Sequence, residues 1–325
     1  MRPSAANRSF SRKIRLTAAG LSSGGRIGLH VEQFGFVIER LVGPHSQRPV
    51  ALGTVGQRGR NPQFHGTAAA QQLAAQGAVY AVVPLKDTAG SLYYASQVPA
   101  AAGSVAANPV DAAAIARVFK ANGITPVAQL AAFRDPAGAR ADHAMAIRYK
   151  GQEYLWLDNK ASAGGNPWLN PYAAEAVQYI GDLIEEVHGM GFDQVLLRNV
   201  QFPSSTSSKQ DYGSTNGVDR AGQLTADIAA WQARFGDTVT LWYGYSLAEV
   251  TGSSSQLGAP AAQLGVKNLL VKVPSSSTLD AAAREELTLS LTLHYRPDWY
   301  NPTPPDVADL IDRDDGSFEE YLAQQ

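Results

Sequence analysis

The sequence predicts an α/β fold, and within that class a (β/α)8 TIM barrel. Strand-like and helix-like segments alternate from about residue 66 to the end of the 325-residue chain. The connections between them are two to five residues long, as compact α/β units require. No Gly-x-Gly-x-x-Gly follows the first clear strand, which disfavours the open doubly wound fold of dinucleotide-binding proteins. Seven or eight such units fit a barrel better than an open sheet.

The strands are predicted from runs rich in β-branched and aromatic residues. The run at residues 78–85 (AVYAVVPL) is too continuously apolar for a half-exposed strand and is typical of a buried parallel one. A weaker pattern at residues 49–55 indicates an earlier strand, so we expect the barrel to be incomplete at its first strand. The six clear strands are predicted at residues 78–85, 124–133, 194–202, 238–245, 268–273 and 289–295.

The helices are predicted from apolar spacing and from their start signals. Asn108 and Pro109 have the residue types of an N-cap and a first helical position, which predicts a helix from there to residue 121. Residues 171–189 carry apolar side chains at three-to-four spacing along one face. Further helices are predicted at residues 66–77, 218–235, 259–264 and 279–287, and from residue 304.

The charge distribution divides the chain into a leader, residues 1–48, and a barrel domain, residues 49–325. Residues 1–60 hold ten Arg or Lys and two Glu, although the net charge of the whole chain is −2. Gly and Ser dilute these basic residues and no aromatic pattern accompanies them, so we expect a poorly ordered leader and no nucleic-acid partner. No apolar region of a signal peptide follows the charges, and no apolar run approaches the length of a membrane span.

The composition excludes several kinds of chemistry. With no cysteine, the chain has no disulfide, thiolate zinc site or cysteine nucleophile. Its six histidines are scattered and form no His-x3-His pair, and it has no Gly-x-Ser-x-Gly elbow and no Gly-rich phosphate cradle. We therefore expect no metal and no cofactor, and a monomer.

A β-hairpin is predicted within the loop that follows the third barrel strand. Residues 145–150 and 153–157 flank the turn residues Gly151 and Gln152. A long loop at this point belongs to the C-terminal face of a barrel, where ligands bind. The alternative is a hairpin without function.

Candidate functional residues lie at or beyond the C-terminal ends of the predicted strands. Polar residues there combine with nearby aromatic rings, on which sugars stack. Glycoside hydrolysis needs two carboxyl groups, at about 5–5.5 Å for retention or about 6.5–9.5 Å for inversion. The carboxylates in these positions are Asp87, Asp135 and Glu249. The candidate substrate-binding residues are Lys86, Arg134, Trp168, Asn170, Arg198, Gln201, Tyr243, His294 and Tyr295.

Four motifs occur in order between residue 78 and about residue 205. They are Lys86-Asp87-Thr88-Ala89-Gly90, Phe133-Arg134-Asp135-Pro136, Trp168-Leu169-Asn170-Pro171, and Phe192-Asp193 with Phe202-Pro203. In these motifs the chain resembles a bacterial family of glycosyl hydrolase-like (β/α)8 barrels. The resemblance implies a barrel fold, an extracellular or cell-envelope location and a cell-wall or extracellular polysaccharide as ligand.

The chain departs from this family at the end of the fourth strand. Where the family has Asp-Tyr-Ile-Arg, this chain has Arg198-Asn199-Val200-Gln201. The presumed catalytic Asp of the family is therefore Arg198, and a guanidinium stays protonated and cannot act as base or nucleophile. Three hypotheses remain: a glycoside hydrolase that uses Asp87 with Glu249 or Asp135, a non-catalytic carbohydrate-binding protein on the same barrel, and a surface assembly protein with the barrel as scaffold.

Overall fold

The computed structural model describes residues 80–204 and 208–273, six residues between 67 and 75, and short stretches at 26–27, 29–31, 36–41, 51–52, 311–313 and 321–323. Its centre is a mostly parallel sheet flanked by helices, so the α/β class is confirmed. Among the described residues, no helix is both long and apolar enough to cross a membrane.

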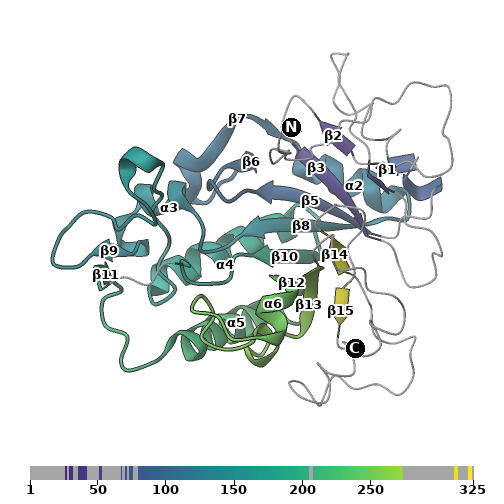
Figure 1. Ribbon diagram of the computed structural model, residues 1–325. Helices are drawn as coiled ribbons and strands as arrows, with labels where there is room; N and C mark the ends of the chain where they lie inside the picture. The colour runs from purple at the N-terminus through teal and green to yellow at the C-terminus, as the bar shows by residue number, and fades with distance from the viewer. Residues whose placement is uncertain are drawn as a thin grey trace, which may run out of the picture.

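Five parallel strands form the core of the sheet and lie side by side in chain order (Figure 1). They are β5 (Tyr80–Lys86), β8 (Thr125–Ala131), β10 (Gln194–Arg198), β12 (Thr240–Ser246) and β13 (Asn268–Val273). The short strand β14 (Ile311–Arg313) pairs with β13 in the same direction. The predicted strands at 78–85, 124–133, 194–202, 238–245 and 268–273 are thus confirmed, with small shifts of their ends.

The helices cover one face of these strands. They are α2 (Ala112–Ala121), α4 (Ala174–Gly189) and α5 (Arg220–Phe235), and their apolar faces share one large core with alternate strand residues. When consecutive parallel strands are neighbours, right-handed crossovers place every helix on the same side of the sheet. The other alternate residues face away from the helices and form a second, smaller cluster: Val82, Val127, Leu196, Trp242 and Leu270. This two-sided arrangement is that of a barrel wall, with helices outside and packed side chains inside.

The strand that lies next to β5 at the edge of the sheet is not the predicted first strand. The neighbour of β5 is β3 (Phe36–Leu41), which runs antiparallel to it and pairs in turn with β2 (Leu29–Val31). Of the residues predicted as first strand, the described ones form β4 (Ala51–Leu52), which pairs with β1 (Arg26–Ile27) in a separate sheet. Among the described strands no pairing joins β14 to β2, so closure of the barrel stays a prediction.

The helix predicted to begin at Asn108 begins later. Residues Val105–Val110 form strand β7, and α2 starts at Ala112 with Asp111 as its N-cap. The Asp111 carboxylate accepts a hydrogen bond from the Ala114 N–H at 2.8 Å, which satisfies one of the free donors of the first helical turn. Pro109 fits in β7 because its only partner in the sheet is the short strand β6 (Leu92–Tyr94), so a missing N–H costs little.

The predicted hairpin is present, and a further strand extends it. The Tyr149 N–H donates to the Tyr154 carbonyl at 2.9 Å and the Trp156 N–H donates to the Ile147 carbonyl at 3.0 Å, on either side of the turn at Gly151. Within it, β9 (Arg148–Tyr149) pairs antiparallel with β11 (Gln210–Asp211) from a later loop. The sequence pattern gave no sign of this second partner.

The remaining elements are short. They are α3 (Pro136–Ala141), α6 (Leu247–Thr251) and the 3-10 turns η1 (Pro99–Ser104), η2 (His143–Met145), η3 (Ala161–Ala163) and η4 (Ala261–Gln263), the last lying where a helix is predicted. The terminal helix predicted from residue 304 is wrong where residues are described, since β14 and β15 (Tyr321–Ala323) are strands that pair with β13. The helix at 279–287 and the strand at 289–295 lie outside the described residues.

Candidate functional site

The C-terminal ends of β5, β8, β10 and β12 lie at one edge of the sheet because the four strands are parallel and adjacent. In parallel α/β folds this edge carries the functional residues. The described residues predicted to act in the site, Tyr243 excepted, fall at this edge or in the loops beyond it, and their contacts distinguish those that support the fold from those open to a ligand.

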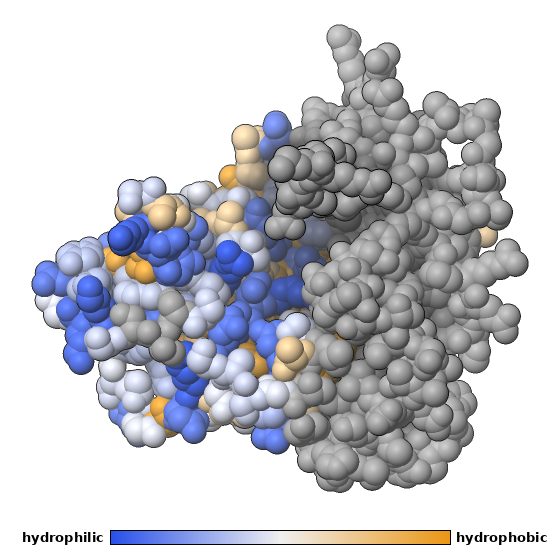
Figure 2. Space-filling model, viewed as in Figure 1, coloured by the Kyte–Doolittle hydropathy of each residue, from blue (hydrophilic) through white to orange (hydrophobic). Residues whose placement is uncertain are grey.

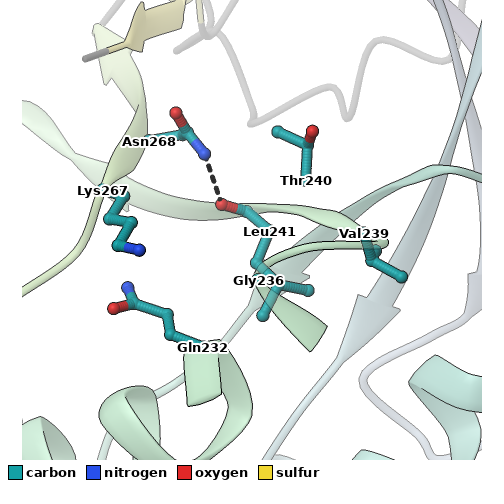
Figure 3. A pocket seen from close by; sticks show the side chains of 7 residues that line it. All are labelled: Gln232, Gly236, Val239, Thr240, Leu241, Lys267 and Asn268. Atoms are coloured by element: carbon teal, nitrogen blue, oxygen red, sulfur yellow. Dashed lines mark hydrogen bonds between the residues drawn. The ribbon is translucent and has the colours of Figure 1, made fainter. Parts of the chain in front are cut away.

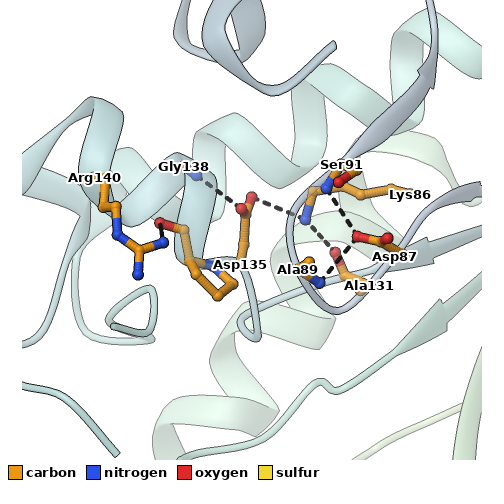
Figure 4. Close-up of polar contacts among 9 residues, drawn as sticks. Lys86, Asp87, Ala89, Ser91, Ala131, Asp135, Gly138 and Arg140 are labelled. Carbon is orange, nitrogen blue, oxygen red and sulfur yellow. Dashed lines mark hydrogen bonds and ion pairs between the residues drawn. The ribbon is translucent and has the colours of Figure 1, made fainter. Parts of the chain in front are cut away.

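Lys86 and Asp135 form a fully buried ion pair (Figure 4). The Lys86 ammonium lies 2.9 Å from the Asp135 carboxylate, and it also donates to the Ala131 carbonyl at 2.5 Å. The other carboxylate oxygen of Asp135 accepts the Gly138 N–H at 2.7 Å and so caps α3. Gly90 is necessary beside this pair, since a Cβ there would lie 2.1 Å from an Asp135 oxygen. The pair joins β5 to α3 and is closed to solvent.

Asp87 holds the turn after β5. One of its carboxylate oxygens accepts the backbone N–H groups of Ala89 and Ser91 at 2.9 and 2.8 Å (Figure 4). The other accepts the Tyr93 hydroxyl at 2.7 Å. Burial and this contact with Asp87 raise the pKa of Tyr93 to about 12, so the phenol stays a donor at neutral pH. Asp87 is half-buried, and both of its oxygens already accept hydrogen bonds from the β5–β6 segment.

Glu249 belongs to the capping box of α6. One of its oxygens accepts the Ser246 N–H at 2.9 Å and the Ser246 hydroxyl at 2.7 Å, and the Ser246 hydroxyl accepts the Glu249 N–H in return. A reciprocal pair of this kind fixes the start of a helix. Glu249 therefore stabilises the connection between β12 and α6.

Arg198 lies at the C-terminal end of β10 on the face of the sheet that the helices leave uncovered. The strand register places it beside Ala131 on β8 and Gly244 on β12, two residues along from Leu196 of the inner cluster. Its guanidinium donates to the Gln129 side-chain oxygen at 3.3 Å. Gly244 gives it room, since a Cβ there would lie 2.7 Å from the Arg198 Cδ. A half-buried cation is thus held across three strands at the functional edge.

β10 stops at Arg198 because the next residue, Asn199, has a left-handed backbone with φ of 56°. Asparagine tolerates this conformation better than most residues. The chain then turns through Gln201, which is 9% exposed, towards Phe202, which is fully buried. Gln201 therefore lies next to the edge with little of its side chain open to a ligand.

Trp168, Asn170 and Arg134 come together beside the hairpin. The Trp168 ring is 5% exposed, packs with Ile147 and Trp156, and donates from its indole to Asp158 at 3.0 Å. Asn170 is also buried, and its side-chain amide donates to the Tyr212 carbonyl at 3.1 Å. Arg134 is exposed, and its guanidinium lies 5.8 Å from the centre of the Trp168 ring. Of these three, only Arg134 faces solvent.

Of the remaining predicted residues, only Tyr243 is among the described ones, and it is not open to a ligand. Tyr243 is fully buried on the helix-covered face, and burial raises the pKa of its hydroxyl well above the usual range. This position gives Tyr243 a role in the core. His294 and Tyr295 lie outside the described residues.

The sequence patterns did not single out three residues that shape this edge: Gln129, Tyr93 and Gly244. Only Gly244 had a signal, because a glycine inside a strand often marks the close approach of another group. Two tyrosines of the hairpin, the partly buried Tyr149 and the exposed Tyr154, were also missed; their rings lie 5.2 Å apart. Among the described residues, no group of three or more His, Asp or Glu side chains could hold a metal ion.

Two cavities occur away from the functional edge. One, of about 430 Å³, lies at the N-terminal ends of β12 and β13 and is lined by residues that include Gln232, Lys267 and Asn268 (Figure 3). The other, of about 450 Å³, lies between α4 and α5 and is lined in part by the buried Asp227. Neither is lined by a residue of the β5, β8 or β10 strand ends.

Solved structures with similarity to this chain include several glycosidases. A hypothetical protein from Ruminiclostridium thermocellum is 22% identical over 55% of this chain and 89% of its own, with a TM-score of 0.48. An exo-β-N-acetylglucosaminidase from Vibrio harveyi is 9% identical over 71% of this chain and 38% of its own (TM-score 0.48), and an α-galactosidase from Thermus thermophilus is 12% identical over 70% and 42% (TM-score 0.42). The chain thus spans about two fifths of the length of either glycosidase.

No curated protein matches the chain in sequence. A protein-family model does match, over residues 66–235, and its description is "Putative glycosyl hydrolase domain". These residues include β5, β8, β10 and the ends of those strands with Lys86, Asp87, Asp135 and Arg198. Because the match covers more than half of the chain, the protein belongs to this glycosyl hydrolase domain family.

Proposed function

We propose that this domain binds a cell-wall or other extracellular polysaccharide at the C-terminal edge of its parallel sheet without hydrolysing it. The observation that carries the proposal is the position of Arg198, which is held by Gln129 over Gly244 on the helix-free face. In a family named for glycosyl hydrolysis, this chain presents a permanent cation where the resemblance implies a catalytic carboxylate.

The contacts of the three candidate carboxylates support binding over hydrolysis. Asp135 is fully buried in its ion pair with Lys86, so no substrate oxygen can approach it. Glu249 accepts two hydrogen bonds from Ser246, and Asp87 accepts three from the β5–β6 segment. A glycosidase needs one carboxyl group that donates a proton and a second that attacks the sugar or activates water. In the described structure each candidate already stabilises the fold.

Arg198 is suited to hold a sugar. A guanidinium offers several N–H donors in one plane, which match vicinal hydroxyls or a carboxylate group of a sugar. The Gln129 side chain fixes its orientation before a ligand arrives, which lowers the entropic cost of binding. Arg134, exposed at the next strand end, is a second donor for the same ligand. We place the protein at the cell envelope or outside the cell, where such polysaccharides occur.

Hydrolysis by Asp87 is the second candidate function, and one observation favours it. Asp87 is half-buried rather than closed to solvent, and one of its two oxygens has only the Tyr93 hydroxyl as a partner. If that contact opens when substrate binds, the carboxylate is available to a glycosidic oxygen. The partner carboxylate would then have to come from a residue other than Asp135, whose position is closed.

Binding and sugar release, measured together, separate the two functions. Wild type, Arg198→Ala and Asp87→Asn are compared by affinity electrophoresis in a panel of bacterial polysaccharides and by reducing-sugar assay. The proposal predicts retention of wild type by at least one polysaccharide, weaker retention of Arg198→Ala, and no sugar release. Arg140→Ala is the matched control, since it removes an exposed arginine of α3 that bonds only within its own helix and to Asn166. Sugar release that disappears in Asp87→Asn would instead establish the hydrolase.

A further inference from the structure

The hairpin at residues 145–157, which β11 extends, carries two neighbouring tyrosine rings, the exposed Tyr154 and the partly buried Tyr149, at the end of the molecule opposite β14 and β15 (Figure 1). Tyr154 is 56% exposed, and Val218 is the only other large hydrophobic residue exposed in the described part of the chain. The ring centres of Tyr149 and Tyr154 lie 5.2 Å apart with an angle of 36° between the rings. Figure 2 shows this end of the molecule as a mostly hydrophilic surface.

The hairpin backbone explains why the two rings share one face. Tyr149 and Tyr154 are joined by a backbone hydrogen bond across the turn, so their side chains leave the hairpin on the same side. The residues two positions further along each arm are Ile147 and Trp156, which are buried with Trp168 in a small aromatic cluster. Tyr149 packs against this cluster and Tyr154 lies beside Tyr149, so the two rings are anchored to a packed base.

Two cationic side chains lie against aromatic rings of the hairpin and its base. The Lys209 ammonium is 5.7 Å from the centre of the Tyr149 ring, and the Arg134 guanidinium is 5.8 Å from the centre of the Trp168 ring. Both side chains are exposed. The acidic neighbour Glu153 points to Arg148, whose position in β9 places it on the opposite face of the hairpin from Tyr149. Lys209 thus places a positive charge beside the Tyr149 ring, whereas the Arg134 end also holds the Asp158 carboxylate, which accepts the Trp168 indole N–H at 3.0 Å.

We propose that Tyr149, Tyr154 and Lys209 form an accessory surface for an acidic polysaccharide, one whose sugars carry carboxylate groups. Sugar rings stack their C–H faces on the tyrosines, and a carboxylate pairs with Lys209. Arg134 follows β8 and lies over the buried Trp168 ring beside the hairpin, so it is the exposed cation through which the same ligand would extend towards the sheet edge. The inference rests on the proposed function for the choice of carbohydrate, and it adds the ligand's charge and a second contact region.

The test uses alginate, a polyuronate, and neutral dextran as probes in affinity electrophoresis with the full-length chain. Tyr154→Ala is expected to weaken alginate retention about five-fold, the order of one aromatic contact. Lys209→Gln should weaken it by a similar factor, and added salt should reduce this second effect, because exposed charges are screened within about 10 Å at 0.1 M salt. The matched controls are Val218→Ala, which removes the other exposed apolar side chain, and Lys120→Gln, which removes an exposed lysine of α2.

The outcomes separate this inference from the proposed function. Loss of alginate retention in Arg198→Ala but not in Tyr154→Ala overturns the accessory surface and leaves the proposed site standing. Loss in Tyr154→Ala and Lys209→Gln but not in Arg198→Ala supports the surface and overturns the proposed site. Equal retention by dextran and alginate overturns the acidic specificity. If wild type is retained by neither probe, the accessory surface is overturned as stated.

Discussion

The Lys86 ammonium lies 2.9 Å from the Asp135 carboxylate, and both side chains are completely closed to solvent. Lys86 ends β5 and Asp135 caps α3, and each also bonds to backbone: Lys86 to the Ala131 carbonyl and Asp135 to the Gly138 N–H. A buried pair with these extra hydrogen bonds specifies how β5, β8 and α3 meet.

We expect Asp135→Asn to destabilise the protein by about 3–5 kcal/mol, because it leaves the Lys86 charge buried without a counter-charge. Lys86→Met alone should have a similar cost. The double variant Lys86→Met/Asp135→Asn should lose less than the sum of the two, since neither charge remains. Urea unfolding followed by circular dichroism measures all three. Additive losses would show that the two residues act independently.

We expect Asp87→Ala to destabilise the protein by about 1–2 kcal/mol, since two backbone N–H groups and the Tyr93 hydroxyl lose their acceptor. Asp87→Asn should cost less, because its side-chain oxygen can still accept from Ala89 and Ser91. Neither change should alter polysaccharide retention if Asp87 only holds its turn. Thermal unfolding and affinity electrophoresis of the same samples check this, and a loss of retention at unchanged stability would place Asp87 in the binding site.

We expect Gly244→Ala to weaken polysaccharide binding roughly ten-fold, about 1.4 kcal/mol. The added methyl group would lie 2.7 Å from the Arg198 Cδ, so the guanidinium has to leave its contact with Gln129. Gly103→Ala is the control, since a Cβ there has no neighbour within 4 Å. Binding that survives Gly244→Ala unchanged would mean that the position of Arg198 does not matter for the ligand.

We expect stability to fall as pH rises from about 4 to about 7 through the titration of Asp227. Burial raises the pKa of this carboxyl from 3.8 to about 7, although a hydrogen bond from Gln223 opposes the shift. The folded state therefore binds a proton that the unfolded state releases in this pH range, and the lost stability is roughly 4 kcal/mol above pH 7. In Asp227→Asn this fall should disappear. Urea unfolding of both proteins at several pH values measures it; parallel pH profiles would contradict the prediction.

The fold was largely predictable from local patterns. Strands β5, β8, β10, β12 and β13 are buried on both faces, so their residues read as continuous apolar runs, and α4 and α5 show regular apolar spacing. The start of α2 was not predictable from residue types alone. Asn108-Pro109 and Asp111 are both acceptable starts, and the pairing of β7 with β6 decides between them.

The candidate site was predictable in position but not in the role of its residues. Strand ends place Lys86, Asp87 and Asp135 at one edge, and a sequence cannot show that their oxygens and nitrogens already bond to one another and to backbone. Arg198 was recognised as a departure from the family motif. Its hydrogen-bond partner Gln129 lies on β8, 69 residues earlier in the chain, and Gly244, which leaves room for its side chain, lies on β12, 46 residues later. The three residues meet because β10 lies between β8 and β12 in the sheet.

The sequence by itself determined the α/β class, the positions of the parallel strands along the chain, and the hairpin. It also showed that Arg198 replaces a carboxylate of the family motif. Each of these features depends on residues close together in the chain. Tertiary structure alone decided which carboxylates are closed to solvent, that β3 runs antiparallel beside β5, and that Tyr154 stays exposed while Trp156 and Trp168 are buried. Burial and hydrogen bonding depend on neighbours in space. Many of those neighbours, such as Lys86 and Asp135, are far apart in the chain and meet only once the sheet has formed.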